Sequence, residues 1–354
     1  MGAAVFVLAF MMVFRYGQGP DYWQYRALYG DAPWKRGFPL FWYTRNLHSE
    51  VGFRLLVNCF TALGIPAFYF FAMWSLVSIG FVYAAIRMVS PYRSLSLLLL
   101  YPTCYLTYLF SGVRQGLVLA VFLCLGLRFY HQRKWGKYCL LVAVLMCFHL
   151  SSAVLFLLIP FAYIKRKWTA LLPVAALGLG IVLCITPFHV WLSGQFNGIF
   201  SRLETVQISW MGLAERTLMY LLILGLYHVQ KQDTIGEYAD DLFRIYTFGY
   251  CIALGGMVNA YYSQRFSVPM KAVEILLFAV LIVNCSKKAY QYLAILFLTA
   301  VTWVMSCKNL GAYFEDQNAF EYQYIGIWDG PDEEMERYIT DVMRWAENTY
   351  NENP

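Results

Sequence analysis

The chain has 354 residues, of which 60% are hydrophobic, 19% aromatic and only 14% charged. A water-soluble domain carries roughly 25% charged residues, so this composition excludes a soluble globular protein. The net charge of +6 does not require a nucleic-acid partner, because basic cytoplasmic loops give membrane proteins such a surplus.

Membrane-spanning helices are predicted along most of the chain. A span needs about 20 mostly apolar residues, because each backbone group in hydrocarbon must be paired within its own helix. The predicted spans are 1–14, 66–86, 94–110, 116–130, 168–187, 213–230, 242–260, 266–284 and 289–306. The first span lacks a basic flank and a cleavage site, so we interpret it as a short helix and not as a signal peptide.

The region 138–164 has the length of one long helix, but basic clusters flank it on both sides. Because Lys and Arg concentrate in cytoplasmic loops, we expect a hairpin of two short half-helices that turns near His149 to Ser152. A single tilted span is the alternative, and it would invert the orientation of one part of the chain. With the hairpin, the sequence predicts an all-α, polytopic integral membrane protein with about ten or eleven transmembrane helices.

The hairpin also makes the distribution of basic loops self-consistent. The loops predicted inside carry Arg87 with Arg93, Arg128 to Lys137, Lys231 with Arg244, and Lys287 with Lys288. The segments predicted outside are 15–65, 111–115, 188–212, 259–264 and the tail from 311. This divides the chain into a transmembrane domain, 1–310, and a C-terminal tail, 311–354.

Two amphipathic segments are predicted outside the spans. The stretch 50–63 is apolar-periodic but too short to cross a bilayer, so we expect a helix in the membrane interface. Trp34, Trp42 and Tyr43 would anchor the segment before it. The acidic tail predicts a small helix around 331–347.

The sequence predicts no metal site and no disulfide framework. Its nine cysteines lie in apolar runs without CxxC or CxxH spacing, which is typical of packing residues. The predicted outer loops contain no Asp-x-Asp pair, and the histidines form no cluster. Asp240 and Asp241 fall on the inner side, where we interpret them as a solvated helix start.

Arginines gather at the predicted outer face of the membrane. They are Arg15, Arg114, Arg216 and Arg265. A guanidinium presents a planar fork that fits phosphate bidentately and stays charged at any working pH, so this group predicts a site for a diphosphate head group. Arg114, beside Gln115, and Arg265, close to Tyr262, are the strongest candidates. Snorkelling of these side chains to lipid phosphates is the alternative.

Three further ionisable residues are candidates for chemistry. Asp21 and Glu50 stand out in the first outer loop, and glycosyl transfer benefits from a carboxylate that accepts the proton of the attacking hydroxyl. Either could serve, although an Asp after Gly-Pro also commonly caps a turn. His149, at the predicted hairpin tip, could orient a phosphate or pass a proton. Tyr22 and Tyr25 are suited to stacking on sugars or to anchoring in the interface.

These motifs, taken together, resemble the EpsG-like family of Wzy-type polysaccharide polymerases. The resemblance covers about the first 165 residues and extends loosely to Arg265. The matching segments, in order and spacing, are Arg15 to Tyr25 (RYGQGPDYWQY), Glu50 to Phe53 (EVGF), Val113 to Gly116 (VRQG), Arg133 to Tyr138 (RKWGKY) and Phe148 to Ser152 (FHLSS).

The resemblance implies a GT-C-like fold in the bacterial inner membrane, with an active site that faces the periplasm. It implies transfer of a growing glycan from undecaprenyl diphosphate to the non-reducing end of a lipid-linked repeat unit, without metal, nucleotide sugar or other cofactor. Membrane lipid and a chain-length regulator protein are further expected partners. The alternatives are an O-antigen ligase-like transferase, a flippase or transporter of lipid-linked oligosaccharides, and, with least support, an O-acyltransferase built around His149.

Overall fold

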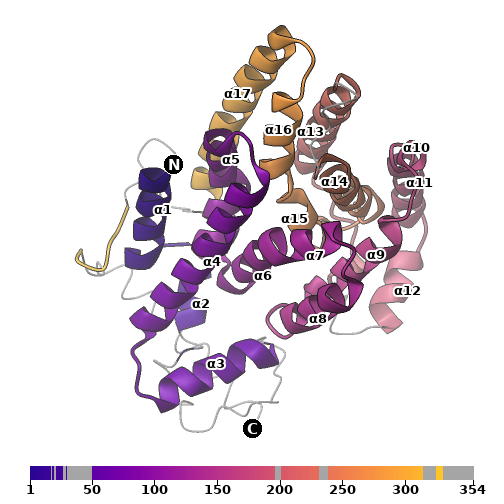
Figure 1. Ribbon diagram of the computed structural model, residues 1–354. Helices are drawn as coiled ribbons and strands as arrows, with labels where there is room; N and C mark the ends of the chain where they lie inside the picture. Colours follow the sequence, from indigo (N-terminus) through magenta and orange to yellow (C-terminus); the bar gives the residue numbers. More distant parts are fainter. Residues whose placement is uncertain are drawn as a thin grey trace.

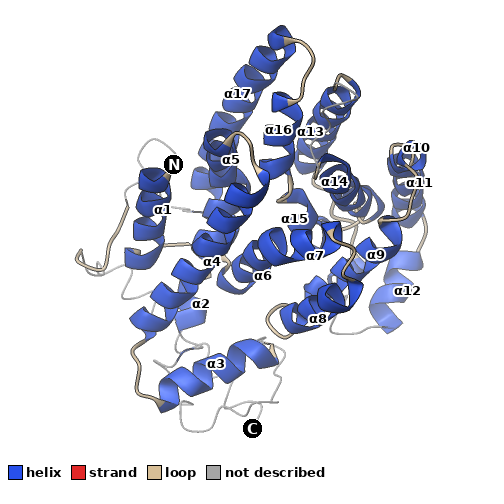
Figure 2. Cartoon of the chain, viewed as in Figure 1, coloured by secondary structure: helices blue, strands red, loops and turns tan. Residues whose placement is uncertain are grey.

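A computed structural model of the chain describes residues 1–16, 18–19, 21–26, 29, 50–195, 201–230, 238–313 and 324–329. In these residues the chain forms helices and loops and no strand (Figure 2). The prediction of an all-α fold is therefore confirmed. The expected anchors Trp34, Trp42 and Tyr43 and the expected helix 331–347 lie outside the described residues.

The arrangement of the helices is shown in Figure 1. In chain order they are α1 (Gly2–Phe14), α2 (Tyr22–Arg26), α3 (Val51–Ala62), α4 (Ala67–Val89), α5 (Arg93–Leu100), η3 (Tyr101–Ser111), α6 (Val113–Val121), η4 (Phe122–Gly126), α7 (Leu127–His131), α8 (Trp135–Met146), η5 (Leu150–Leu157), α9 (Leu158–Phe161), α10 (Arg166–Thr169), α11 (Leu172–Ile185), α12 (Phe188–Gln195), η6 (Ser201–Glu204), α13 (Trp210–His228), α14 (Ala239–Gly255), α15 (Ala260–Lys271), α16 (Glu274–Val283) and α17 (Lys288–Tyr313).

Glycine and proline set several of these helix ends. Gly64 has a φ of +69°, a left-handed conformation that suits glycine, and it follows the end of α3. Pro66 is the N-cap of α4, and Pro173 lies in the first turn of α11, where a missing backbone N–H costs nothing. These breaks separate apolar runs that the hydropathy pattern predicts as distinct helices.

Several helices in the described residues are long and apolar enough to cross a membrane. Four continuous helices qualify: 67–89, 93–111, 113–131 and 288–311. Two more qualify if each bent pair counts as one span: α11 with α12, bent by 81°, and α15 with α16, bent by 44°. The sequence predicts about ten or eleven spans, because it also counts shorter apolar segments such as α1, α8 and Leu150–Phe161. The chain is thus a polytopic helical membrane protein.

The region 138–164 is a hairpin. α8 ends at Met146, and η5 begins at Leu150 with His149 in an extended conformation as its N-cap. The two halves pack against each other, and the Tyr138 hydroxyl donates a 2.9 Å hydrogen bond to the carbonyl of Leu155. The expectation of a hairpin is confirmed, and the single tilted span is excluded.

Three short backbone pairings join loops that the sequence predicts to lie on the same side of the membrane. The pairs are Arg15 with Gly326, Gln207 with Asn259, and Gln230 with Cys285. In the first two pairs both partners belong to segments predicted outside. In the third pair both partners lie next to basic loops predicted inside. We call the first side the Arg114 side, because Arg114 lies there, and the other the opposite side.

Asp241 on the opposite side is not solvated, so the expectation of a solvated helix start is wrong for this residue. Its side chain is buried and accepts hydrogen bonds from Arg133 at 2.7 Å, while His131 Nδ1 lies 3.0 Å from its other oxygen. Burial of a carboxylate is favourable only when such partners compensate for lost water. These contacts hold the start of α14 to the end of α7.

Helix α16 lies at the centre of the bundle. All of its residues from Glu274 to Ile282 are buried, as expected for a helix that is apolar on every side. A second, smaller core lies beneath α2 and α3 and includes Phe53, Phe70 and Trp74. This second core supports the candidate site described next.

Candidate active site

Glu50 joins three segments that lie far apart in the sequence. One carboxylate oxygen pairs with the guanidinium of Arg114 at the start of α6. The other accepts a 3.2 Å hydrogen bond from the backbone N–H of Leu150 and lies 3.5 Å from Nδ1 of His149. The first outer loop, the turn before α6 and the hairpin tip therefore meet at one carboxylate.

Gly52 makes this junction possible. Its N–H donates a 2.7 Å hydrogen bond to the carbonyl of Cys147, and a Cβ atom at this position would lie 2.7 Å from the same oxygen. No other residue type has room for so close a backbone approach. The Glu50-Val-Gly-Phe segment thus forms the first turn of α3, and the same turn makes the hydrogen bonds to the hairpin tip.

The Arg114 guanidinium lies between aromatic rings. It is 5.4 Å from the ring centroid of Tyr25 and 5.7 Å from that of Phe53, and Nε donates a 3.3 Å hydrogen bond to the Tyr25 hydroxyl. Stacking on aromatic faces stabilises a guanidinium and fixes its plane. The indole N–H of Trp74 donates a 2.8 Å hydrogen bond to the carbonyl of Val113, which holds the backbone beside it.

Asp21 lies within the electrostatic reach of two of the arginines. Burial raises the pKa of its carboxyl above the ordinary value of 3.8, and the positive charges of Arg114 and Arg265 oppose part of that rise. Arg114 and Arg265, which are separated by some 150 residues of chain, therefore lie on the same side around one carboxylate. Among the described residues, the Asp21 side chain makes no hydrogen bond.

The two carboxylates have opposite acid-base properties. Burial would raise the pKa of Glu50, but His149 and Arg114 beside it outweigh burial and lower the pKa to about 2. Glu50 is therefore a very weak base that stays ionised, whereas Asp21 holds a proton more readily than an ordinary aspartate. Neighbouring charge and burial set the different pKa values of Glu50 and Asp21. The sequence alone does not distinguish which of the two accepts the proton.

Glu50→Gln is expected to destabilise the folded protein, with the thermal midpoint lowered by about 2–4 °C at neutral pH. Because the pKa of Glu50 is lowered on folding, its stabilising effect is present above the unfolded pKa near 4.5 and is lost as the pH falls toward 2. Thermal unfolding of the detergent-purified protein across this pH range measures it. Glu204→Gln, at an exposed glutamate, is the matched control; an equal effect of both changes would contradict the role of Glu50.

His149 is buried with both ring nitrogens unbonded within the described part of the chain. It lies too far from Glu50 for a good hydrogen bond, at 3.5 Å. Nε2 has no contact of this kind, and a buried nitrogen without a partner is costly, so Nε2 is available to a group that enters the site. The Nε2 atom of Gln115, the residue after Arg114, is likewise buried without a partner among these residues.

The remaining predicted residues lie around this centre. Arg15 ends α1, donates a 3.0 Å hydrogen bond to the carbonyl of Met12, and lies 5.9 Å from the ring centroid of Tyr22. Arg265 lies 4.5 Å from the ring centroid of Tyr261 on α15, and Tyr262 stacks along the same helix on Phe266. Arg15, Tyr22 and Arg265 thus share the side on which Asp21 and Arg114 lie.

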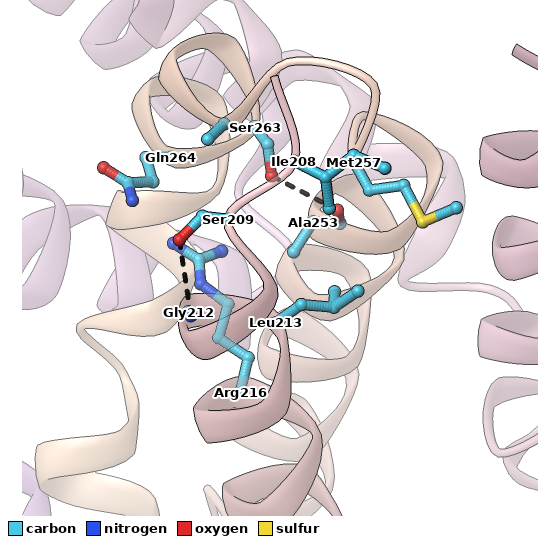
Figure 3. A pocket seen from close by; sticks show the side chains of 10 residues that line it. Ile208, Ser209, Gly212, Leu213, Arg216, Ala253, Met257, Ser263 and Gln264 are labelled. Atoms are coloured by element: carbon cyan, nitrogen blue, oxygen red, sulfur yellow. Dashed lines mark hydrogen bonds between the residues drawn. The ribbon is translucent and has the colours of Figure 1, made fainter. Parts of the chain in front are cut away.

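Arg216 belongs to a different pocket. Its guanidinium donates a hydrogen bond to Ser267 of α15. Ser209, Gly212 and Gln264 line the same pocket, which Figure 3 shows. The sequence predicts one group of four arginines, but Arg216 binds Ser267, whereas Arg114 binds Glu50. The residues beside it that sequence reasoning missed are Glu215, Lys271 and Lys308. Ionisable residues within apolar spans are the signal that could have identified Glu215 and Lys271.

The described residues contain no group of three or more His, Cys, Asp or Glu side chains that could hold a metal ion. The candidate site consists instead of guanidiniums, two carboxylates, an imidazole and tyrosines. This donor set fits an anionic, phosphate-bearing ligand.

Comparison with known proteins identifies the family. Residues 1–324 match the model of the EpsG family. The chain belongs to the EpsG family. Members of the EpsG family are Wzy-like polymerases and glycosyltransferases, so the chain is a membrane protein of polysaccharide biosynthesis. The resemblance inferred from the motifs is confirmed over most of the chain. No curated protein and no solved structure matches it, so the GT-C-like arrangement of this EpsG-family protein stays a prediction.

Proposed function

We propose that this EpsG-family protein is a polysaccharide polymerase. It transfers a growing glycan from undecaprenyl diphosphate to the non-reducing end of a lipid-linked repeat unit at the periplasmic face of the bacterial inner membrane. The observation that carries this proposal is the Asp21 carboxylate, which lies near both Arg114 and Arg265 and makes no hydrogen bond among the described residues. A proton acceptor beside two phosphate-binding cations is what glycosyl transfer from a diphosphate requires.

Asp21 is the proton acceptor in this proposal, and Glu50 is a positioning residue. A general base works best when its pKa lies near the operating pH, and burial moves Asp21 in that direction. Glu50 has a pKa of about 2, and its oxygens already bind Arg114 and the Leu150 N–H. Its role is to orient Arg114 and the hairpin tip.

Arg114 and Arg265 hold the diphosphate of the donor. As the hydroxyl oxygen of the acceptor forms a bond to the anomeric carbon, the bond from that carbon to the diphosphate oxygen breaks, and undecaprenyl diphosphate leaves with the electron pair. Asp21 receives the proton of the hydroxyl. The guanidiniums stabilise the negative charge that develops on the leaving oxygen, and no metal ion takes part in this scheme.

The side chains without partners complete the site. The Nε2 atoms of His149 and Gln115, both buried and unbonded among the described residues, donate hydrogen bonds to phosphate or sugar oxygens. Tyr22, Tyr25 and Tyr262 contact the sugar or the lipid head group, and Arg15 adds positive charge at the edge of the site.

Incubation of the purified protein with a defined undecaprenyl-diphosphate-linked repeat unit tests this proposal. A ladder of products that differ by one repeat unit is expected. A single transfer to another acceptor would indicate a ligase, and translocation across vesicles without any new glycosidic bond would indicate a flippase. Either of these results would contradict the proposal that the protein is a polymerase.

A further inference from the structure

A polar cavity on the Arg114 side takes no part in the mechanism above. It is lined by Glu215 and Arg216 of α13, Lys271 of α15 and Lys308 of α17, together with polar residues of η3. The Lys271 ammonium lies 2.8 Å and the Lys308 ammonium 3.7 Å from the two carboxylate oxygens of Glu215. Three cations face Glu215 here, and a second carboxyl, Glu274, is buried behind the lining residue Thr103 within reach of Lys271. The cavity therefore keeps a net positive charge of at least +1.

An apolar groove lies farther along the same two helices, toward the opposite side. It is lined by the stretch from Leu221 to Val229 of α13 and by the stretch from Tyr290 to Phe297 of α17. Its floor includes the buried residues Leu226 and Ala294, and its walls include Leu221 and Leu293, which are more than half exposed. Gly225 also lines the groove, and a Cβ atom there would meet nothing within 4 Å.

The cavity and the groove follow one another along the helices. Along α13 the helix rises about 7.5 Å from Arg216 to Leu221, and along α17 it rises about 12 Å from Phe297 to Met305. The apolar lining therefore begins within about two turns of the cationic cavity. Helix α16 packs against both α13 and α17, which flank it in Figure 1. One charged head on one long apolar chain matches this shape, because the head meets the cations while the chain follows the groove.

The positive charge of the cavity favours an anionic head group. Four ionisable side chains at membrane depth are costly, and one ion pair would suffice to hold two helices together. A surplus of positive charge complements a diphosphate, which carries about two negative charges. A long single chain fits the single groove better than the paired chains of a phospholipid.

We propose that α13 and α17 bind the acceptor lipid by its diphosphate and its polyprenyl chain. The identity of this lipid rests on the polymerase function proposed above. The donor breaks the bond at its own diphosphate, so that diphosphate must lie beside Asp21. The acceptor reacts at the far end of its glycan, so its diphosphate needs a site of its own. Two adjacent residues of α15 belong to the donor site and to the acceptor site. The charge of Arg265 interacts with Asp21, and Gln264 lines the cavity.

Native mass spectrometry of the full-length protein with undecaprenyl diphosphate tests this proposal, because it counts bound lipids without catalysis. The wild-type protein is expected to bind two lipids. Gly225→Trp fills the groove and is expected to bind one. Gly80→Trp is the matched control, because Gly80 is exposed on α4 and its Cβ atom would also meet nothing within 4 Å.

The head-group cavity is tested separately with Lys308→Gln. Loss of one charge-assisted contact is expected to weaken the second binding event by at least about tenfold. Lys288→Gln, at the other end of α17, is expected to leave it unchanged. A thermal unfolding midpoint equal to that of the wild-type protein separates weaker lipid binding from a loss of helix packing.

Two results would overturn the acceptor site. In the first, both Gly225→Trp and Lys308→Gln still bind two lipids with wild-type affinity. In the second, phosphatidylglycerol displaces the second lipid at equal concentration, which would make this a general site for anionic lipids. If groove variants lose one lipid while the wild-type protein makes no polymer, the polymerase proposal fails and the lipid site stands.

Discussion

Arg114→Lys is expected to lower the rate of polymerisation by about 10²–10³-fold, although it keeps the positive charge. Lysine is a point charge on a flexible chain and cannot bind a diphosphate bidentately or lie flat on the rings of Tyr25 and Phe53. The initial rate of product formation from a defined lipid-linked repeat unit measures the effect.

Arg128→Lys is the matched control for this prediction, because Arg128 is exposed at the other end of the same span. It is expected to retain the wild-type rate. The pairing of Arg114 with Glu50 also stabilises the fold, so both variants need a thermal unfolding curve. A folded Arg114→Lys protein that makes full-length polymer at the wild-type rate would rule out the guanidinium as the diphosphate ligand.

Asp21→Asn is expected to lower the rate by about 10²–10⁴-fold, because the amide cannot accept the proton of the attacking hydroxyl. The substrate should still bind, so the loss should appear in kcat and only weakly in KM. Initial rates over a range of substrate concentrations separate the two parameters. Asp240→Asn, on the opposite side, gives the control for an aspartate-to-asparagine change.

The pH dependence of the wild-type rate gives a second measurement on Asp21. The proton acceptor must be ionised, and burial raises its pKa above 3.8. The rate is therefore expected to fall as the pH drops through this raised pKa, at a higher pH than for an exposed aspartate. A rate that stays constant down to pH 4, or an Asp21→Asn protein with wild-type kcat, would assign the proton transfer to another group.

The sequence predicts the helices well, because helix formation in a membrane depends on local hydropathy. Hydropathy locates most spans to within a few residues, and the basic loops predict one side for Arg15 and Gly326, which the structure pairs with each other. The hairpin follows from charge alone, since Lys and Arg at both ends of 138–164 require an even number of crossings.

The contacts of the site depend on packing between distant segments, which local patterns do not report. Glu50, Arg114 and His149 were each predicted as candidates, but their meeting depends on the fit of Gly52 against Cys147. The separation of Arg216 from the other arginines depends on the side of α13 that faces α15. The hydropathy of α13 does not indicate which of its sides faces α15.

A structure of the protein with a bound undecaprenyl-diphosphate-linked repeat unit tests the central claim most directly. The account predicts that the donor diphosphate lies between the guanidiniums of Arg114 and Arg265, with the anomeric carbon next to the Asp21 carboxylate. A diphosphate bound away from both arginines, or a reacting carbon remote from Asp21, would contradict it.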